Sequence, residues 1–541
     1  MKTFVPAFGV QGSVMGWDDP WGKHLSDVTM RTGTGRIVPS QDTPPDASTF
    51  MEAIKRLGYA FYVHHLFPGG EDLAPLLQDA TQFDIDVVLG NEYGNINGPW
   101  IAGTNRYDIP TDFIKQALQS GKLAGLLYDE PEHLQINAAQ YRKDSWSPHF
   151  GNIEAISMEA AQQQYVTAIE QQVAAIHQAT APAELPVIAE HVFPTMFHAH
   201  ARAGMTLAPK MMKESFQSLQ LSTALGAAKQ YKRQLWICSD LWGPDVGNWF
   251  IRTSGFPGHS PAEFAAALQL GYHFAPDRLF VENIDGILQH KNGQFHNTEF
   301  GDIWEQFRYE YVPQHPLAYH HSDATADIVL IHSDDSNYGQ NERPFGIREL
   351  DMPTSSNSIF AAWHLISHEQ IPAHGSCLHI PGYKFPRHAL QKGTVQYPLE
   401  QGVSTDIYGE GIHPLFQAAN NVLVFDGYVS KDIIGQPKLI ILAGSYISST
   451  TLQAVRQLAE AGCTVIACKH LLPVELQQEK QFASGGLWLP VEQLLSEQAR
   501  AAAAPHLGKA DQWKQRFGNY ELLITPQDQQ GFAVNIETIN L

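Results

Sequence analysis

The stretch Ala124–Pro131 reads AGLLYDEP, a short apolar run that ends in two adjacent acids and a proline. An apolar run of this length predicts a buried strand, and the polar residues after it predict a loop. Seven similar runs lie in the first 320 residues, with helical patterns between them. In chain order, the eight predicted strands are Phe4–Val10, Tyr59–His65, Ile85–Gly90, Ala124–Tyr128, Pro186–Ala189, Met205–Pro209, Leu235–Ser239 and Leu279–Glu282.

Eight strands that alternate with helices predict a (β/α)₈ TIM barrel over residues 1–320. The expected helices include Met158–Gln178, Leu221–Tyr231 and Ser260–Phe274, the last with Pro261 at its first position. The sixth strand is the least regular, because Pro209 interrupts it. Without that strand, every later strand would move down by one number.

After residue 320 the sequence predicts a second, smaller α/β domain over residues 321–505, of flavodoxin-like or amidotransferase-like type. It has no glycine-rich phosphate loop and no cysteine at Gly444-Ser445-Tyr446, where an amidotransferase would carry one, so we expect no cofactor. A short β appendage is predicted over residues 506–541. The elements expected after residue 320 are the strands Ala326–Ile331, Val422–Phe425, Pro437–Ala443, Cys463–Ala467, Tyr520–Thr525 and Phe532–Ile536, and the helices Ser358–His368 and Ser449–Ala461.

The composition excludes several classes of partner. The chain of 541 residues has 35 basic and 56 acidic side chains, a net charge of −21. The acids are spread along the chain, so the surface repels phosphate groups, and we expect neither nucleic acid nor membrane as a partner. With 11% aromatic and only 17% charged residues, the composition favours a neutral polar ligand such as a sugar.

No apolar run approaches the roughly 18 residues of a membrane span. Pro6, Gly9 and Gly12 break the N-terminal apolar stretch, so we interpret it as a strand rather than an export signal. We therefore expect a cytoplasmic protein, with export after removal of a leader as the alternative.

Acidic residues follow five of the eight predicted barrel strands, at the ends where barrel enzymes carry their active sites. Buried carboxylates that repel one another are costly to folding, so their number predicts chemistry. Glycosidic cleavage uses pairs of carboxyl groups in this way. The candidate catalytic acids are Asp129, Glu130, Glu190, Asp240 and Glu282. The candidate substrate contacts are Asn91, Glu92, His64, His191, Trp242, Asn283, Lys210 and Trp17.

The segment Leu126–Pro131 resembles the fourth-strand signature of clan A glycoside hydrolases, an apolar strand that ends in Asn-Glu-Pro, although Asp129 replaces the Asn. A barrel followed by a flavodoxin-like domain is also similar to the domain order of family 42 β-galactosidases. The resemblance implies that Glu130 is the acid/base and that the nucleophile closes the seventh strand. That acid is Asp240 if the sixth strand exists and Glu282 if it does not. Because clan A nucleophiles are glutamates, Glu282 is our first choice and Asp240 our second.

Other functions use the same residues. The adjacent Asp129 and Glu130 also resemble the substrate-assisted hexosaminidases of families 20 and 123, in which Asp129 would hold an acetamido group and Glu130 would be the acid. Asp129, Glu190 and Asp240 match the strand order of the α-amylase clan. A polysaccharide lyase would use a basic residue such as Lys210 to neutralise a uronate. A non-catalytic carbohydrate-binding barrel is the remaining alternative.

Several residues have structural alternatives. Glu282 could form a buried ion pair with Lys210 or Arg278, and Glu132 is expected as a first-turn helix acid. The His198-Ala199-His200 triplet is expected in a loop, where it would form hydrogen bonds rather than a metal centre. We thus predict a retaining, exo-acting glycoside hydrolase that acts on an oligosaccharide without metal or cofactor and that forms homo-oligomers, if any, through its C-terminal α/β domain.

Overall fold

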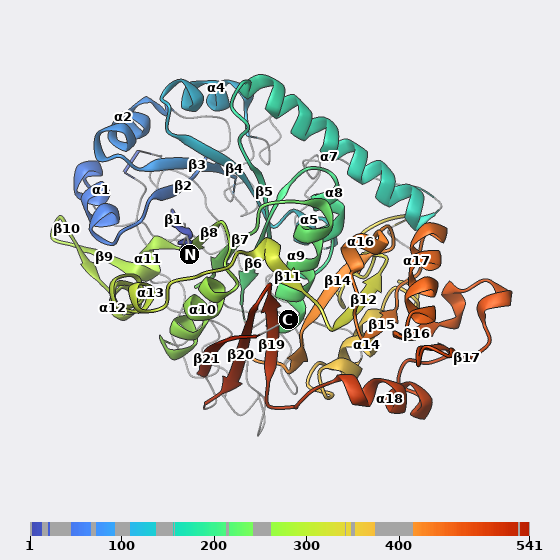
Figure 1. Cartoon of the computed structure of the whole chain (residues 1–541). Helices are drawn as coiled ribbons and strands as arrows, with labels where there is room; N and C mark the ends of the chain where they lie inside the picture. The colour runs from blue at the N-terminus through green and yellow to red at the C-terminus, as the bar shows by residue number, and fades with distance from the viewer. Residues whose placement is uncertain are drawn as a thin grey trace, which may run out of the picture.

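The computed structural model describes residues 3–12, 20–21, 45–66, 72–91, 109–136, 155, 157–212, 216–241, 261–340, 342–347, 352–373, 415–527 and 531–539. Its N-terminal part is a closed barrel of eight strands, each paired in parallel with its neighbours in chain order (Figure 1). These strands are β1 (Ala7–Gln11), β2 (Phe61–His65), β3 (Asp86–Gly90), β4 (Leu123–Asp129), β5 (Val187–His191), β6 (Thr206–Met211), β7 (Trp236–Ser239) and β8 (Arg278–Val281). All eight predicted strands are confirmed, including the sixth, in which Pro209 pairs with His191 of β5.

Helices cover the outside of the barrel between its strands (Figure 1). They are α1 (Ala47–Arg56), α2 (Ala74–Phe83), α4 (Thr111–Gln119), α5 (Pro131–Ile136), α7 (Met158–Thr180), α8 (Phe197–Arg202), α9 (Gln217–Tyr231) and α10 (Pro261–His273). Side-chain caps define their starts: the Thr49 amide donates to Asp46 before α1, and the Ala160 amide donates to Ser157 before α7. Among the described residues, no helix has both the length and the apolar character needed to cross a membrane.

A segment of short helices and one hairpin connects β8 to the rest of the chain. It comprises α11 (Ile284–Ile287), the hairpin strands β9 (Leu288–Lys291) and β10 (Gln294–Asn297), α12 (Glu299–Gln306), the π-helical turn η2 (Phe307–Tyr311), α13 (Val312–Gln314) and the 3₁₀ turn η3 (His321–Asp323). The Trp304 indole donates to the Leu57 carbonyl and its ring stacks on Tyr59, so α12 is fixed against the barrel after α1.

The inside of the barrel is packed with side chains from alternate strand positions. They form one apolar cluster, which contains Phe61, Val63, Val88, Ala124, Leu127, Ile188, Ala208, Trp236, Cys238 and Phe280. Gly9 makes room for this packing, because a Cβ there would lie 2.2 Å from the Phe61 ring. Since side chains alternate along a strand, the residues two positions after this cluster point into the mouth at the carboxyl end of the barrel.

The second domain contains a six-stranded sheet with the order β14-β12-β15-β16-β18-β17. Its strands are β12 (Ile328–His332), β14 (Val422–Asp426), β15 (Leu439–Leu442), β16 (Thr464–Cys468), β17 (Lys480–Gln481) and β18 (Leu487–Val491), and only β17 runs antiparallel. The associated helices and turns are α14 (Ser358–Ile366), α16 (Lys431–Ile434), α17 (Ser449–Glu460), η5 (Lys469–Leu471), η6 (Val474–Leu476), α18 (Glu497–Ala503) and η7 (Ala504–His506). As expected, α17 ends before Gly462, which has φ of 122°.

The C-terminal residues form part of a third sheet. The predicted strands correspond to β20 (Tyr520–Pro526) and β21 (Phe532–Thr538), but the sequence did not indicate β19 (Trp513–Phe517) beside them. Two further strands, β11 (Ala324–Thr325) and β13 (Ala419–Asn420), also pair with β19. The sheet therefore joins the C-terminal segment to the chain on either side of β12.

Helix α9 links the barrel to the second domain by packing on β14, the edge strand of the six-stranded sheet. Gly226 allows this approach, because a Cβ there would lie only 1.7 Å from the Val424 carbonyl oxygen. Gln230 and the Tyr231 hydroxyl both donate to the Asp426 carboxylate, at 2.5 and 2.6 Å. The helix thus covers a strand edge that would otherwise be open.

Candidate active site

Four carboxylates converge on one ammonium at the carboxyl end of the barrel. Lys210 Nζ lies 2.8 Å from Glu282 Oε2, 3.1 Å from Asp129 Oδ1, 3.3 Å from Glu130 Oε1 and 3.9 Å from Glu190 Oε1. These side chains come from β4, β5 and β6 and from the residues directly after β4 and β8. The structure therefore brings together four of the five predicted catalytic acids.

Strand alternation explains why these residues meet. Each inward-facing site residue lies two positions after a side chain that fills the barrel interior. The pairs, with the filling residue first, are Leu127 and Asp129, Ile188 and Glu190, Ala208 and Lys210, Cys238 and Asp240, and Phe280 and Glu282. The uppermost layer of the barrel is thus acidic, with one lysine in its centre.

The charge of this layer is unbalanced. Burial alone would lower the pKa of Lys210, but the four surrounding carboxylates raise it well above its ordinary value. The ammonium therefore stays charged near neutral pH. Four acids around one cation leave an excess of negative charge in a place that water scarcely reaches, which favours positive charge on a bound group.

The backbone at Glu130 is strained. Its φ is +46°, in the left-handed region that glutamate rarely adopts. The strain is held by neighbours: the Glu130 amide donates to the Glu190 carbonyl at 3.0 Å, and the Asp129 amide donates to Asn91 Oδ1 at 2.8 Å. Pro131 then starts α5. Strain of this kind persists where it positions a functional side chain. Here the strained backbone places the Glu130 carboxylate against Lys210. Asn91, predicted as a substrate contact, lies at the site and orients the end of β4.

His133 of α5 contacts the other oxygen of Glu130. Its Nδ1 lies 2.6 Å from Glu130 Oε2, and its ring packs edge-on against Phe193. The His133 side chain is fully buried, whereas the Glu130 side chain is 14% exposed. Sequence reasoning missed His133, although its position three residues after Glu130 on a helix is the spacing at which side chains meet.

Glu132 lies in the first turn of α5, as expected, but it does more than interact with the helix dipole. Its Oε1 accepts from the amides of Val192 and Phe193, at 2.7 and 3.0 Å. Burial raises the pKa of Glu132 well above its ordinary value, and the charge of Glu130 adds to this effect. The carboxyl group thus ties α5 to the segment after β5.

His191, predicted as a substrate contact, lies in a buried hydrogen-bonded chain. Its Nε2 is 2.8 Å from His200 Nδ1, and His200 Nε2 is 2.8 Å from the Tyr165 hydroxyl. The His191 ring also stacks on Phe197 at 4.1 Å, and its Nδ1 lies 3.2 Å from the Thr195 carbonyl. This placement gives His191 a role in supporting the segment after β5.

The prediction for His64 needs correction. Val63 points into the barrel, so alternation directs His65 inward and His64 towards the helices. His64 accordingly contacts the rings of Tyr62 and Trp21. Trp21 itself donates its indole hydrogen to an aspartate of α2 and packs in the outer core, so it is a structural side chain.

The sixth strand places Asp240 directly after β7 and Glu282 directly after β8. Both side chains are buried. Burial raises the pKa of the nearby Cys238 thiol, and the charges of Glu190, Glu282 and Asp240 add to this effect. Asn283 follows Glu282 in a left-handed conformation, with φ of 64°, and begins α11. The predicted residues Glu92, Trp242 and Trp17 lie outside the described residues.

The His198-Ala199-His200 triplet was expected in a loop, but it lies in the buried helix α8. The two histidines point to different partners, because His198 contacts His332 of β12 and His200 contacts His191. Among the described residues, neither histidine makes a described contact with the carboxylates around Lys210.

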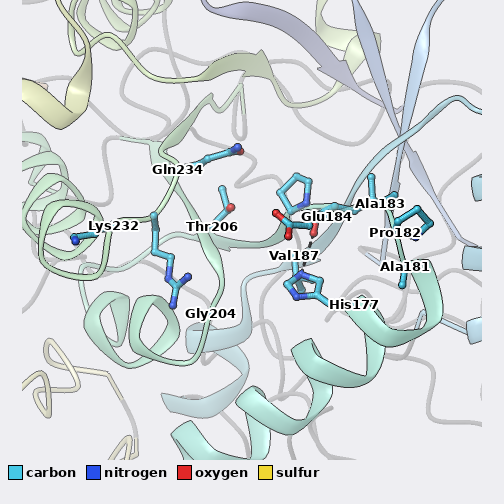
Figure 2. Close-up of a pocket in the computed structure, with 13 residues that line it drawn as sticks. His177, Ala181, Pro182, Ala183, Glu184, Val187, Gly204, Thr206, Lys232 and Gln234 are labelled. Atoms are coloured by element: carbon cyan, nitrogen blue, oxygen red, sulfur yellow. Dashed lines mark hydrogen bonds between the residues drawn. The ribbon is translucent and has the colours of Figure 1, made fainter.

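A cavity of about 630 Å³ lies at the other end of the barrel, where β5 and β6 begin (Figure 2). Its lining includes His177, Glu184, Thr206, Lys232 and Gln234. Barrel enzymes react at the carboxyl ends of their strands. This cavity is therefore separate from the carboxylates, and we do not assign the reaction to it.

No protein-family model and no curated protein matches this chain. Among solved structures, a β-galactosidase from the psychrophilic Marinomonas ef1 is 9% identical, with 98% of this chain and 100% of that chain covered and a TM-score of 0.49. An exo-β-1,4-mannosidase from Opitutaceae bacterium strain TAV5 is 11% identical, with coverage of 99% and 86% and a TM-score of 0.44. The catalytic module of a family 98 glycoside hydrolase from Streptococcus pneumoniae TIGR4 is 12% identical, with coverage of 97% and 76% and a TM-score of 0.41. At TM-scores below 0.5, the function has to be inferred from the site itself.

Proposed function

We propose that this chain is a glycoside hydrolase that cleaves O-glycosidic bonds with retention of configuration. The observation that supports it best is the meeting of Glu130 and Glu282 on one ammonium. Glu130 Oε1 and Glu282 Oε2 lie 3.3 and 2.8 Å from Lys210 Nζ, so these two oxygens are at most about 6 Å apart. Retaining enzymes hold their two carboxyl groups about 5–5.5 Å apart, whereas inverting enzymes need about 6.5–9.5 Å.

We assign the acid/base role to Glu130 and the nucleophile role to Glu282. Glu130 has the most exposed side chain of the four carboxylates at Lys210, so it can reach the departing group and the incoming water. Glu282 is almost buried and makes the shortest contact with Lys210, and a neighbouring cation favours the ionised form that attack requires. Asp240, at the end of β7, is the second choice of nucleophile.

The remaining acids stabilise the transition state. Cleavage passes through a species with positive charge on the sugar ring. The negative charge of Asp129 and Glu190, which a single ammonium does not balance, favours that species. Exo-action is part of the proposal, because long segments follow β1, β3, β4 and β7 in the sequence, and such segments can close a pocket around one chain end.

The test is a panel of nitrophenyl glycosides assayed with the wild type and with Glu130→Gln, Glu282→Gln and Asp240→Asn. Glu52→Gln, on the exposed face of α1, is the matched control. We expect Glu282→Gln to abolish turnover and Glu130→Gln to retain some activity on substrates with good leaving groups, which need no acid. Nuclear magnetic resonance of the first product then gives the anomer. A product of opposite configuration would refute retention, and full activity of Glu130→Gln and Glu282→Gln would refute the site.

A substrate-assisted hexosaminidase is the second candidate, because Asp129 and Glu130 stand side by side on Lys210. In that mechanism Asp129 holds the acetamido group of the substrate and no enzyme carboxylate attacks. Activity confined to N-acetyl sugars, with Asp129→Asn inactive and Glu282→Gln active, would favour it over the first proposal.

We also infer that the second domain is flavodoxin-like. Numbered along the chain, its five parallel strands have the order 2-1-3-4-5, which supports this inference. The inference also agrees with the similarity of domain order to family 42 β-galactosidases. If the chain forms homo-oligomers, we propose that this domain supplies the contact, which gel filtration with light scattering of a Val474→Asp variant would test, since Val474 is 81% exposed there.

A further inference from the structure

A second group of possible ligand side chains lies where the barrel meets the six-stranded sheet. It consists of His198 from α8, His332 at the end of β12 and Asp334 two residues later. One ligand atom from each residue lies within 4.8 Å of the other two, and all three side chains are buried. The histidines are 134 positions apart in the sequence, so only the packing of the two domains brings them together.

The two imidazoles have the separation of ligands on one ion. His198 Nδ1 and His332 Nε2 are 3.3 Å apart. Two nitrogens on a tetrahedral zinc ion, each bonded at about 2.0–2.1 Å, are separated by about 3.3 Å.

The surrounding backbone orients His198 as it would a metal ligand. His198 Nε2 lies 3.1 Å from the Val424 carbonyl oxygen, to which it can only donate. The hydrogen therefore resides on Nε2, and the lone pair of Nδ1 points to His332. Ligating histidines commonly donate their second ring nitrogen to a backbone carbonyl in this way.

Asp334 is held in place and has no cationic partner among the described residues. Its Oδ1 accepts from the Met196 amide at 2.7 Å and its Oδ2 from the Ala199 amide at 3.0 Å. Within the described part of the chain, no lysine or arginine forms an ion pair with it, and the negative charges of Asp426 and Asp335 act on it. A buried carboxylate without an ion-pair partner is costly, and a divalent cation would neutralise it.

We propose that a divalent transition-metal ion binds to His198, His332 and Asp334 and fastens the barrel to the second domain. The chemistry of these three ligands indicates zinc. Two imidazole nitrogens and a carboxylate oxygen suit zinc better than calcium or magnesium, which prefer oxygen alone. Water would fill the fourth tetrahedral position. The site is separate from the carboxylates at Lys210, so the ion stabilises the fold whether or not the proposed hydrolysis is correct.

The test uses the full chain, stripped with a chelator and then dialysed against zinc chloride. We expect about one zinc per chain by mass spectrometry of the metal, and none in His332→Gln. The matched control is His320→Gln, because His320 belongs to another group of possible ligands, with Asp277 and His321. If His320→Gln loses the zinc while His332→Gln keeps it, the ion lies elsewhere and the proposal is wrong.

Two further measurements cover a variant that fails to fold. Cobalt chloride added to the stripped wild type should give visible absorption bands of a tetrahedral ion, which zinc should abolish. Zinc should also raise the melting temperature of the wild type by several degrees, as for any ligand that binds only the folded state. A wild type that takes up no zinc and shows no cobalt bands would establish that the two rings share only a hydrogen bond, and would overturn the proposal.

Discussion

Lys210 Nζ lies 2.8 Å from Glu282 Oε2, a closer contact than it makes with any of the three other carboxylates around it. Glu282 follows β8 and Lys210 is on β6, so neither strand neighbours the other in the closed barrel. The pair therefore bridges over β7, which lies between these two strands. It places an ammonium against one carboxylate at the carboxyl end of the barrel, and the other acids are arranged around this ammonium.

Removing the ammonium should harm both stability and catalysis. Lys210→Met would leave four carboxylates, three of them buried, without their cation, a loss of about 3–5 kcal/mol in the free energy of unfolding. The pKa of Glu282, the proposed nucleophile, should rise without a positive charge beside it, so the acidic limb of the kcat/KM profile should move to higher pH. Urea unfolding and the pH profile measure the two effects. Lys115→Met, on the exposed surface of α4, is the control. Unchanged stability and an unchanged acidic limb in Lys210→Met would show that Lys210 does not hold these acids.

The hydrogen bond between His133 and Glu130 should matter for the rate. His133→Leu removes a partner at 2.6 Å from the carboxyl group of Glu130, the proposed acid/base. A hydrogen bond to a charged group is worth about 1.5–3 kcal/mol, so kcat/KM should fall about 10–100-fold. The pKa of Glu130 should rise, so the basic limb of the kcat/KM profile should move to higher pH. His133→Gln keeps a donor and should recover part of the rate; equal losses in both variants would indicate a packing role instead.

The barrel strands could be predicted because they leave a local signal. A buried parallel strand is a short apolar run, and its carboxyl end is marked by polar residues such as Asp129 and Glu190. Pro209 blurred that pattern in the sixth strand, yet the strand forms. The same local logic predicted β12, β14, β15 and β16 of the second domain.

What the sequence could not show depends on pairing between distant segments. Strands β11 and β13 have two residues each and are strands only because β19 lies beside them. The role of Lys210 as a shared partner follows from barrel closure, which no single strand reveals. His332 lies far from His198 in the sequence, and no metal-binding sequence motif links the two. One correction was within reach of the sequence: alternation from the inward-facing Val63 predicts that His65, and not His64, faces the barrel interior.

Gly226→Ala tests the packing of α9 on β14. By helix propensity alone, alanine for glycine inside a helix should stabilise by about 1 kcal/mol. The added Cβ would instead lie 1.7 Å from the Val424 carbonyl oxygen, in backbone that cannot rotate away. We therefore expect a loss of about 3 kcal/mol or more in urea unfolding, a magnitude typical of severe steric conflicts. Ala174→Gly, at an exposed position of α7, should show the propensity effect alone. Stabilisation by Gly226→Ala would mean that the two domains do not meet as described.

Buried histidines should make the protein sensitive to mild acid. Burial lowers the pKa of both His200 and His273 to about 3 in the folded state, against about 6.5 in an unfolded chain. Below pH 6.5 the unfolded state therefore binds protons that the folded state does not. The stabilisation is complete above that pH and is lost as the pH falls towards 3, by about 1.4 kcal/mol per unit for each histidine.

His273→Phe should make this dependence shallower. The variant removes one proton-binding group, together with the contact of His273 Nε2 with the Tyr311 hydroxyl at 2.8 Å. The variant should be less stable than the wild type at pH 7.5, but the two urea-derived stabilities should converge between pH 6 and 4.5, by about 1.4 kcal/mol per unit. His177→Gln, at an exposed position of α7, should keep the wild-type slope. Parallel curves for His273→Phe and the wild type would show that His273 takes up its proton in the folded state, and hence that burial does not keep it neutral.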